Sequence, residues 1–209
     1  MKLTWTLIVV ALIGPPSPAI RIEASTPQAQ QPMPKGQMPD LGRPTRPGDV
    51  APPLDFGAYF QGAWNFEWDV PEGPLGPSGR ITGTTTYKKI DDRFFEADTT
   101  ATGPAGRFTL HEVIGYNRDE KFLSRFVTDS RGYSYLQSAP VSGDAGGIYY
   151  IYLESSPFTV NGHTVRIKHN LRLLSPLNYR VAISVSDNGG PFVNYGNPWW
   201  RKDAAGSAR

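Results

Sequence analysis

Residues 158–173 read FTVNGHTVRIKHNLRL and have the pattern of a β-hairpin. Asn161-Gly162 is the pair that favours a type I′ turn, and this turn sets Val160 opposite His163. Beyond the turn, one face is apolar apart from a histidine: Val165, Ile167, His169, Leu171 and Leu173. The residues of the other face are Thr164, Arg166, Lys168, Asn170 and Arg172. One dry face and one wet face are what the wall of a β-barrel requires.

The same two-residue alternation continues on both sides of the hairpin. Further strand-like runs between turn signals are 79–90, 93–101, 106–116, 120–128, 132–142, 147–156, 178–187 and 192–201. A first strand follows Gly62 and places Trp64, Phe66, Trp68 and Val70 on one face. Residues 54–61 have the apolar spacing of a short helix. The sequence therefore predicts an all-β domain over residues 54–202, an antiparallel up-and-down barrel of about ten strands with a short N-terminal helix.

The N-terminus has the features of a signal peptide over residues 1–24. Lys2 precedes an apolar run from Leu3 to Gly14, which prolines then interrupt. At about 1.5 Å per residue this run reaches about 18 Å, less than the roughly 30 Å of a bilayer core. Cleavage after Ala19 and cleavage after Ala24 are both compatible with the pattern. We expect an exported protein, periplasmic or extracellular, with no membrane span once the signal is removed.

Composition describes the segments around the domain. Residues 25–53 hold eight prolines and few large apolar side chains, so we expect a disordered, proline-rich linker, and a disordered tail over 203–209. The chain has no cysteine, so the fold must depend on its core rather than on disulfides. A net charge of +2 without basic clusters argues against nucleic-acid binding.

Short motifs give the domain a family resemblance. Residues 62–64 (GAW) resemble the Gly-x-Trp signature of lipocalins and other calycins. The turns at 115–117 (GYN) and 130–132 (SRG), and the ending at 187–191 (DNGGP) and 199–202 (WWRK), are similar to those of a bacterial lipocalin-like group, the DUF1579 type. This group is distantly similar to nitrobindin-like haem barrels. The resemblance implies a lipocalin-like barrel with an interior that can hold a ligand.

The resemblance also implies how the barrel is closed. In calycins the signature tryptophan closes one end and is covered by an arginine from the last strand, a cation–π contact worth about 0.5–2 kcal/mol. Trp64 and Arg201 would form this pair here. The cysteines that form disulfides in many secreted lipocalins are missing. Pro198 before the two tryptophans is also unusual for this family pattern.

Candidate ligand contacts are residues expected on the inner wall. These candidates are one histidine, His169, and five apolar or aromatic residues, Tyr150, Tyr152, Ile167, Leu171 and Tyr179. Alternation sends Tyr150 and Tyr152 to one face and Tyr149 to the other, and the pattern leaves open which face is inside. The threonine-rich run 79–90 suggests a partly polar lining. Of the other histidines, His163 is expected at a rim and His111 on the outside.

No constellation indicates catalysis. No HxH, HExxH or compact group of His, Asp and Glu predicts a metal site. Ser78 lies among glycines but lacks the Gly-x-Ser-x-Gly spacing of a nucleophile elbow. The sequence thus gives no reason to predict an enzyme.

Three functions remain open. The first is binding of a small apolar or amphipathic molecule inside the barrel, and the second is a non-enzymatic envelope or interaction module with a filled barrel. The third is a haem protein in which His169 ligates the iron, as the nitrobindin-like resemblance suggests. The interior discriminates between them, because a pocket of roughly 300 Å³ or more lined by His169 and tyrosines favours binding. A filled interior favours the interaction module.

Overall fold

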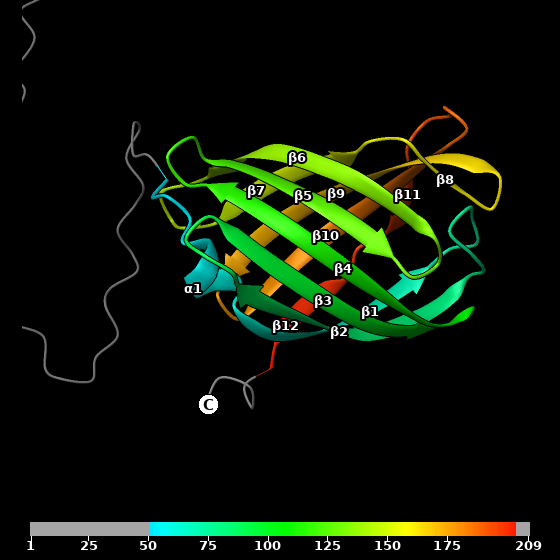
Figure 1. Ribbon diagram of the computed structural model, residues 1–209, viewed down its shortest axis with the longest axis horizontal. Helices are drawn as coiled ribbons and strands as arrows, with labels where there is room; N and C mark the ends of the chain where they lie inside the picture. Colours follow the sequence, from blue (N-terminus) through cyan, green and yellow to red (C-terminus); the bar gives the residue numbers. More distant parts are fainter. Residues whose placement is uncertain (1–50, 204–209) are drawn as a thin grey trace, which may run out of the picture. The chain divides into compact units, whose positions relative to one another are not determined.

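A computed structural model describes residues 51–203 as an all-β domain with one short helix (Figure 1). The predicted signal peptide, the linker up to residue 50 and the tail from residue 204 lie outside the described residues. The elements are α1 (Phe56–Phe60), β1 (Gly62–Val70), β2 (Gly79–Lys89), β3 (Phe94–Gly103), β4 (Gly106–Asn117), β5 (Phe122–Asp129), β6 (Tyr133–Gly143), β7 (Tyr149–Ser155), β8 (Phe158–Val160), β9 (His163–Ser175), β10 (Asn178–Asp187), β11 (Val193–Gly196) and β12 (Trp199–Lys202).

The strands close into an antiparallel lipocalin-like barrel with ten strand positions, as predicted. The order around the barrel is β1, β2, β3, β4, β5, β6, β7, β9, β10 and β12, and β12 pairs back to β1. The two short strands β8 and β11 pair with the ends of β9 and β10. Neighbours in sequence are therefore mostly neighbours in space, and closure leaves the main strands without free edges.

The hairpin predicted from the sequence forms with the expected register. Val160 pairs with His163 and Phe158 pairs with Val165. Asn161 and Gly162 both have positive φ, as a type I′ turn requires. From this turn β9 continues to Ser175, and its residues Ile167, His169 and Leu171 face the interior.

One predicted strand, 192–201, is divided. Asn197 and Pro198 separate β11 from β12, because proline has no N–H to donate to a sheet ladder. The break lets β11 pair with one end of β10 while β12 crosses between the other end of β10 and β1.

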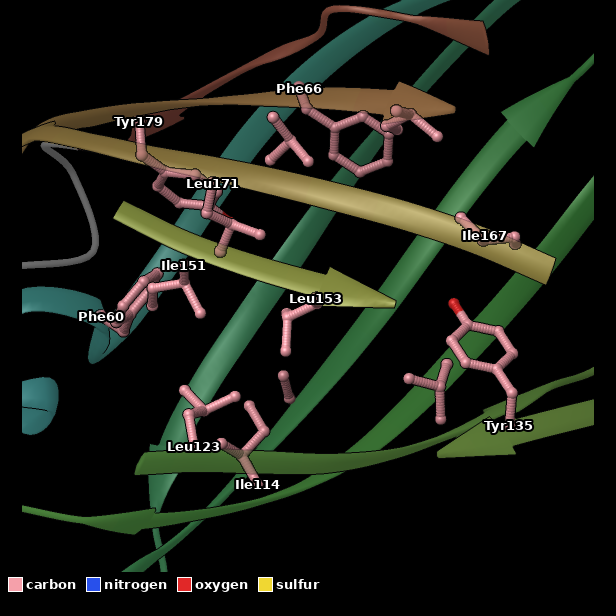
Figure 2. Close-up of a cluster of buried hydrophobic side chains, with 14 of the residues drawn as sticks. Phe60, Phe66, Ile114, Leu123, Tyr135, Ile151, Leu153, Ile167, Leu171 and Tyr179 are labelled. Carbon is pink, nitrogen blue, oxygen red and sulfur yellow. The ribbon is translucent and has the colours of Figure 1, made fainter. Parts of the chain in front are cut away.

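One cluster of buried side chains forms the core, and Figure 2 shows part of it. Asp55 caps α1 by accepting a hydrogen bond from the Ala58 N–H at 2.9 Å. The helix places Phe60 against Trp64 and Tyr179, with ring centroids 6.2 and 5.4 Å away. Trp64 is completely buried and donates from Nε1 to the Phe60 carbonyl at 2.6 Å. This end of the barrel is therefore closed by aromatic packing.

Within residues 51–203, no helix is long and apolar enough to cross a membrane.

Candidate functional site

An internal cavity of about 100 Å³ lies in the barrel beyond the aromatic end. The aromatic and aliphatic part of its wall includes Phe66, Tyr87, Leu110, Tyr135, Ile167, Leu171, Tyr179, Ile183 and Trp200. The polar part consists of Thr85, Thr99, Glu112, Arg125, Asp129, Arg131 and His169. The cavity is roomy enough for water or a small molecule but smaller than the roughly 300–1,000 Å³ of pockets for drug-sized ligands. The interior is thus not filled, but its volume is below the roughly 300 Å³ that would favour ligand binding by the criterion set from the sequence.

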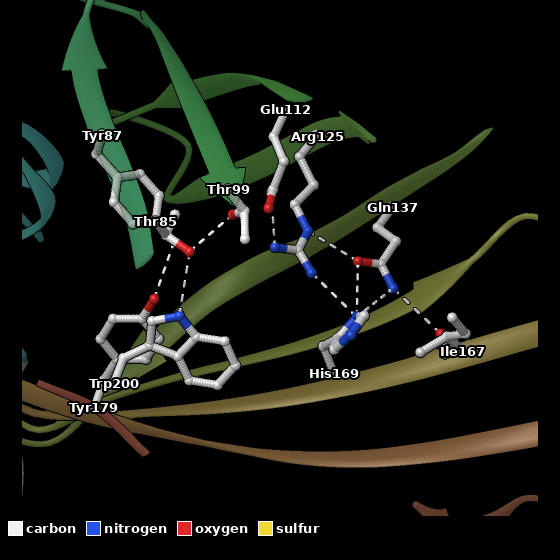
Figure 3. A network of polar contacts seen from close by, with 10 residues as sticks. All are labelled: Thr85, Tyr87, Thr99, Glu112, Arg125, Gln137, Ile167, His169, Tyr179 and Trp200. Carbon is white, nitrogen blue, oxygen red and sulfur yellow. Dashed lines mark hydrogen bonds and ion pairs between the residues drawn. The ribbon is translucent and has the colours of Figure 1, made fainter. Parts of the chain in front are cut away.

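Arg125 is the centre of a polar network inside the barrel (Figure 3). It lies on β5 and donates from Nη1 to Glu112 Oε2 at 3.0 Å and from Nε to Gln137 Oε1 at 2.9 Å. Burial opposes the charge of Arg125, but the Glu112 carboxylate and nearby tyrosines raise its pKa above the usual value. Glu112 and Arg125 therefore form a buried ion pair, and the hydrogen bond to Gln137 offsets part of its desolvation.

The same network fixes the proton on His169. Burial, with the Arg125 charge as a second cause, holds the pKa of His169 well below its usual value, so the ring is neutral. Arg125 Nη2, which can only donate, lies 3.1 Å from His169 Nδ1. Gln137 Nε2, whose orientation is set by its bond to the Ile167 carbonyl, lies 3.0 Å from the same nitrogen. His169 Nδ1 is therefore an acceptor, and the ring proton is on Nε2.

Other polar groups of the cavity are paired with each other. The hydroxyls of Tyr87 and Tyr179 lie 3.0 Å apart, and burial raises the pKa of both. Thr85 and Thr99 bond across β2 and β3 at 2.8 Å, and Trp200 Nε1 donates to Thr85 at 3.4 Å. These pairs are also seen in Figure 3.

Apart from Glu112 Oε1, whose carboxylate is already paired through Oε2, two polar side-chain atoms at the cavity have no hydrogen-bond partner within residues 51–203. One is His169 Nε2, since all hydrogen bonds of this ring are made through Nδ1. The other is the hydroxyl of Tyr135, which Figure 2 shows directed toward Ile167. Burial raises the pKa of Tyr135, so the hydroxyl keeps its proton. The cavity thus offers two uncommitted hydrogen-bonding groups beside apolar surface.

The end of the barrel opposite α1 is covered by the loop 71–78 between β1 and β2. Leu75 from this loop lines both the internal cavity and a small pocket at the rim, and so does Arg131. Arg131 is fixed by Asp129, a side chain with no exposed surface, and its guanidinium lies 4.1 Å from the Phe108 ring centroid. The loop accepts bonds of 3.4 Å from Arg131 at the Leu75 carbonyl and 3.3 Å from Asn161 at the Pro74 carbonyl, and Tyr195 and the core also contact it.

Four of the six predicted ligand contacts line the cavity: Ile167, His169, Leu171 and Tyr179. Tyr150 and Tyr152 do not, and their assignment to the inner wall was wrong. Tyr152 is 62% exposed, and the two rings stack on each other on the outer face of β7. The physical reason is the register of β7 with β9, which places Ile151 opposite Leu171 and so turns the alternate residues outward.

The predicted pair of Trp64 and Arg201 also needs correction. Trp64 is buried as expected, but Arg201 pairs with Asn65 and is exposed on the outer face. The residue opposite Trp64 is Lys202, whose ammonium lies 5.3 Å from the Trp64 ring centroid and donates to the Tyr59 carbonyl at 3.2 Å. Partial burial lowers the pKa of Lys202. The cation that covers the signature tryptophan is thus one residue further along the chain.

The residues that sequence reasoning missed are Glu112, Arg125, Gln137 and Tyr135. A signal for the first two was present. Glu112 alternates with Leu110 and Ile114 on the apolar face of its strand, and Arg125 alternates with Leu123 and Val127 on the adjacent strand. Opposite charges on the inner faces of adjacent strands indicate a buried ion pair.

The cavity does not fit haem. A porphyrin is at least as large as the molecules that occupy pockets of about 300 Å³ or more, and this cavity has about 100 Å³. Iron would also need the lone pair of His169 Nε2, which carries the proton here because Nδ1 accepts from Arg125. No group of three or more His, Cys, Asp or Glu side chains within residues 51–203 is arranged to hold a metal ion.

Comparisons with known proteins concern the fold. No family model matches the chain, and no curated protein matches it. Among solved structures, it is similar to the crystal structure of Rv2717c from M. tuberculosis, with a TM-score of 0.60 and 12% identity over 74% of this chain and 99% of that one. It is more distantly similar to a de novo designed fluorescence-activating β-barrel, with a TM-score of 0.42 and 14% identity over 72% of this chain and 99% of that one. The first likeness supports the barrel fold alone, and the DUF1579-type resemblance stays a prediction.

Proposed function

We propose that the protein binds a small amphipathic molecule in the cavity of the barrel. The observation that carries this proposal is the pair of uncommitted groups, the Nε2–H of His169 and the hydroxyl of Tyr135, in a cavity whose other polar atoms are largely paired. Both atoms have accessible surface within the cavity, so a ligand that bonds to both gains directed hydrogen bonds worth about 0.5–1.5 kcal/mol each.

The wall of the cavity limits the chemistry of the ligand. Glu112 is paired with Arg125, and Asp129 with Arg131, so the lining carries no net formal charge. His169 presents a donor, which calls for an acceptor such as a carbonyl oxygen on the ligand. The apolar side chains around it, Phe66, Leu171 and Ile183 among them, suit a ring or a short hydrocarbon. An uncharged molecule of about one ring with one acceptor oxygen matches these features.

The loop 71–78 is the proposed entrance. The α1 end is closed by aromatic side chains, whereas the cavity and the pocket at the rim share four lining residues, Trp68, Leu75, Phe108 and Arg131. The loop is held by the long hydrogen bonds from Arg131 and Asn161, by Tyr195 and by the packing of Leu75 on the core, so opening it would require these contacts to break.

A matched pair of probes tests the proposal. Acetophenone and α-methylstyrene have nearly the same shape, but only acetophenone has an acceptor oxygen. By isothermal titration calorimetry, acetophenone is expected to bind about ten-fold more tightly, the value of one good hydrogen bond. Tyr135→Phe is expected to lower the affinity for acetophenone and to leave the affinity for α-methylstyrene unchanged. Tyr152→Phe is the control, because that hydroxyl lies outside the barrel.

Either of two results would contradict the proposal. One is equal affinity for both probes in the unaltered protein, and the other is an unchanged acetophenone affinity in Tyr135→Phe. Native mass spectrometry of protein recovered from its own cells complements the probes, since a co-purifying small mass would identify the natural ligand.

We propose further that the protein acts outside the cytoplasm. The charged start and the apolar run within residues 1–24 support export, and the absence of cysteine is compatible with it. Cell fractionation tests this directly, since a full-length chain confined to the cytoplasm would contradict it.

A further inference from the structure

A groove lies on the outside of the barrel, over β1, β2 and β3 and beside β12. These four strands are neighbours in the sheet (Figure 1). The groove has a volume of about 740 Å³, within the range of roughly 300–1,000 Å³ for pockets that hold small molecules. Most of its lining comes from side chains that point away from the interior, so it is a different site from the internal cavity.

The groove exists because β12 begins only at Trp199. β12 pairs with β1 as far as Glu67, and beyond this residue β1 pairs only with β2 within residues 51–203. Asn197 and Pro198, which precede β12, line the groove at this point. The proline that divides the predicted strand therefore also leaves room for the groove.

Hydroxyl groups and an amide form the floor of the groove. Thr82 pairs with Thr102 across β2 and β3, and both line the groove. Thr84 pairs with Thr100 in the same way. The hydroxyl of Thr84 also donates to Asn65 Oδ1 on β1 at 2.8 Å, which leaves the Asn65 NH₂ group as a donor. Since a hydroxyl can donate and accept, the floor offers both kinds of hydrogen-bonding group.

The charged side chains at the groove balance one another. Arg80 donates to the two carboxylate oxygens of Asp69 at 2.8 and 3.1 Å, and it lies 3.9 Å from Glu67. Arg201 lines the groove opposite Asn65, and its side chain forms no ion pair within the part of the chain that the structure describes. Two carboxylates and two guanidinium groups leave no net formal charge, which favours an uncharged ligand.

Trp199 adds a flat apolar surface to this polar groove. Its ring is 39% exposed and lines the groove from β12. In the sheet, Trp199 lies between Arg180 on β10 and Glu67 on β1. The Arg180 guanidinium lies 6.0 Å from the ring centroid and covers the side of the ring toward β10. The side toward β1 therefore faces the groove.

These features together match one class of ligand. A pyranose ring has C–H groups on its faces and hydroxyls around its edge. Its C–H face can stack on an indole, whose face carries partial negative charge, while its hydroxyls bond to the floor. A hydrocarbon would leave the donors and acceptors of the floor without partners, and a charged group would meet no excess of opposite charge.

We propose that this groove binds a neutral oligosaccharide, with one pyranose ring stacked on Trp199 and its hydroxyls bonded to Asn65 and the threonines of the floor. The volume is in the upper part of the range for small-molecule pockets, which favours a short oligosaccharide over a single sugar. This inference does not depend on the ligand proposed for the internal cavity.

NMR titration of the whole chain with cellotriose and with maltotriose tests the groove. Both probes are neutral trisaccharides of glucose and differ in their linkage, so binding of either supports the proposal. The backbone amides of Thr84, Thr100 and Trp199 are expected to shift with a dissociation constant of about 1 mM or lower. The amide of Ile167, beside the internal cavity, is expected to stay in place.

Matched variants assign the binding to individual groups. Trp199→Ala is expected to raise the dissociation constant by about ten-fold, and Trp199→Phe by less, because a ring is kept. Thr100→Val removes one hydroxyl from the floor and is expected to raise it by about five-fold. Thr128→Val is the control for this exchange, since Thr128 is exposed on β5 and away from the groove.

Tyr152→Ala is the control for the loss of an exposed ring, because Tyr152 lies on β7 and does not line the groove. Circular dichroism checks that every variant folds. The proposal is overturned if neither trisaccharide shifts the groove amides at about 10 mM, or if Trp199→Ala binds as tightly as Tyr152→Ala. Shifts confined to residues of the internal cavity would also overturn it, because the sugar would then bind inside the barrel.

Discussion

His169 shows how neighbouring side chains determine the chemistry of one residue. Its Nδ1 receives hydrogen bonds from Arg125 and Gln137, and burial disfavours a second proton on the ring. The Glu112 carboxylate holds Arg125 in place, so the chain of contacts that fixes the ring begins with a carboxylate on a different strand of the barrel. The result is a neutral donor at the cavity and not a metal ligand.

The depressed pKa of His169 makes the stability of the fold depend on pH. In the unfolded chain this residue is protonated below a pH of about 6.5. In the folded protein it becomes protonated only at a much lower pH. The free energy of unfolding should therefore fall as the pH decreases from 7.5 to 5, with a slope from this residue of up to about 1.4 kcal/mol per pH unit. Urea titrations of the unaltered protein and His169→Gln measure this slope.

The comparison of variants isolates the effect, because carboxylates also titrate in this range. His169→Gln should lose its share of the slope, whereas Tyr152→Phe, a change on the exposed outer face, should keep it. Equal slopes for the unaltered protein and His169→Gln would show that the ring is not held neutral by the fold.

Some of the individual residues of the site were predictable from the sequence. Ile167, His169 and Leu171 were assigned to the inner wall because a single strong turn fixes their register. Tyr150 and Tyr152 were not placed correctly, because both faces of their strand carry large apolar side chains and alternation alone gives no direction. Only the pairing of β7 with β9 decides which face is inside.

Among the elements, the β8–β9 hairpin depends most directly on two residues of sequence. Asn161 and Gly162 have φ values of 50° and 81°, a left-handed region that most residues avoid. Gly162→Ala is therefore expected to lower the free energy of unfolding by about 1–2 kcal/mol. Asn161→Gly should cost less, about 0.5 kcal/mol, because glycine is also favoured at that position and only the long bond to the Pro74 carbonyl is lost. Urea denaturation compares the two, and equal effects would mean that the turn does not fix the hairpin.

Most elements were predictable for the same local reason, and the exceptions have a local cause. The short helix, the first strand and the hairpin follow from alternation and turn residues. The division at Asn197 and Pro198 was missed, although a proline within a strand pattern favours a break. The assignment of Arg201 to Trp64 failed by one residue, and in a strand one residue moves a side chain to the other face.

Closure of the whole molecule depends on its shortest barrel strand. β12 has four residues, yet it connects β1 to β10 and completes the ring of strands. Its hydrogen bonds alone are few, so the side chains of this strand must contribute much of the attachment. Trp200 stacks on Phe66 with ring centroids 4.8 Å apart and on Tyr179 at 5.4 Å, which ties the two neighbouring strands together.

Two adjacent tryptophans allow this account of closure to be tested. Trp200→Ala removes both stacked contacts and the bond to Thr85, and is expected to cost about 3–5 kcal/mol of stability. Trp199→Ala changes the same residue type one position away, but Trp199 is 39% exposed on the outer face, so its cost should be about 1 kcal/mol or less. Urea unfolding followed by circular dichroism ranks the two variants. If Trp199→Ala proved as costly as Trp200→Ala, the barrel would be closed by the strand's backbone pairing and not by the ring that it places inside.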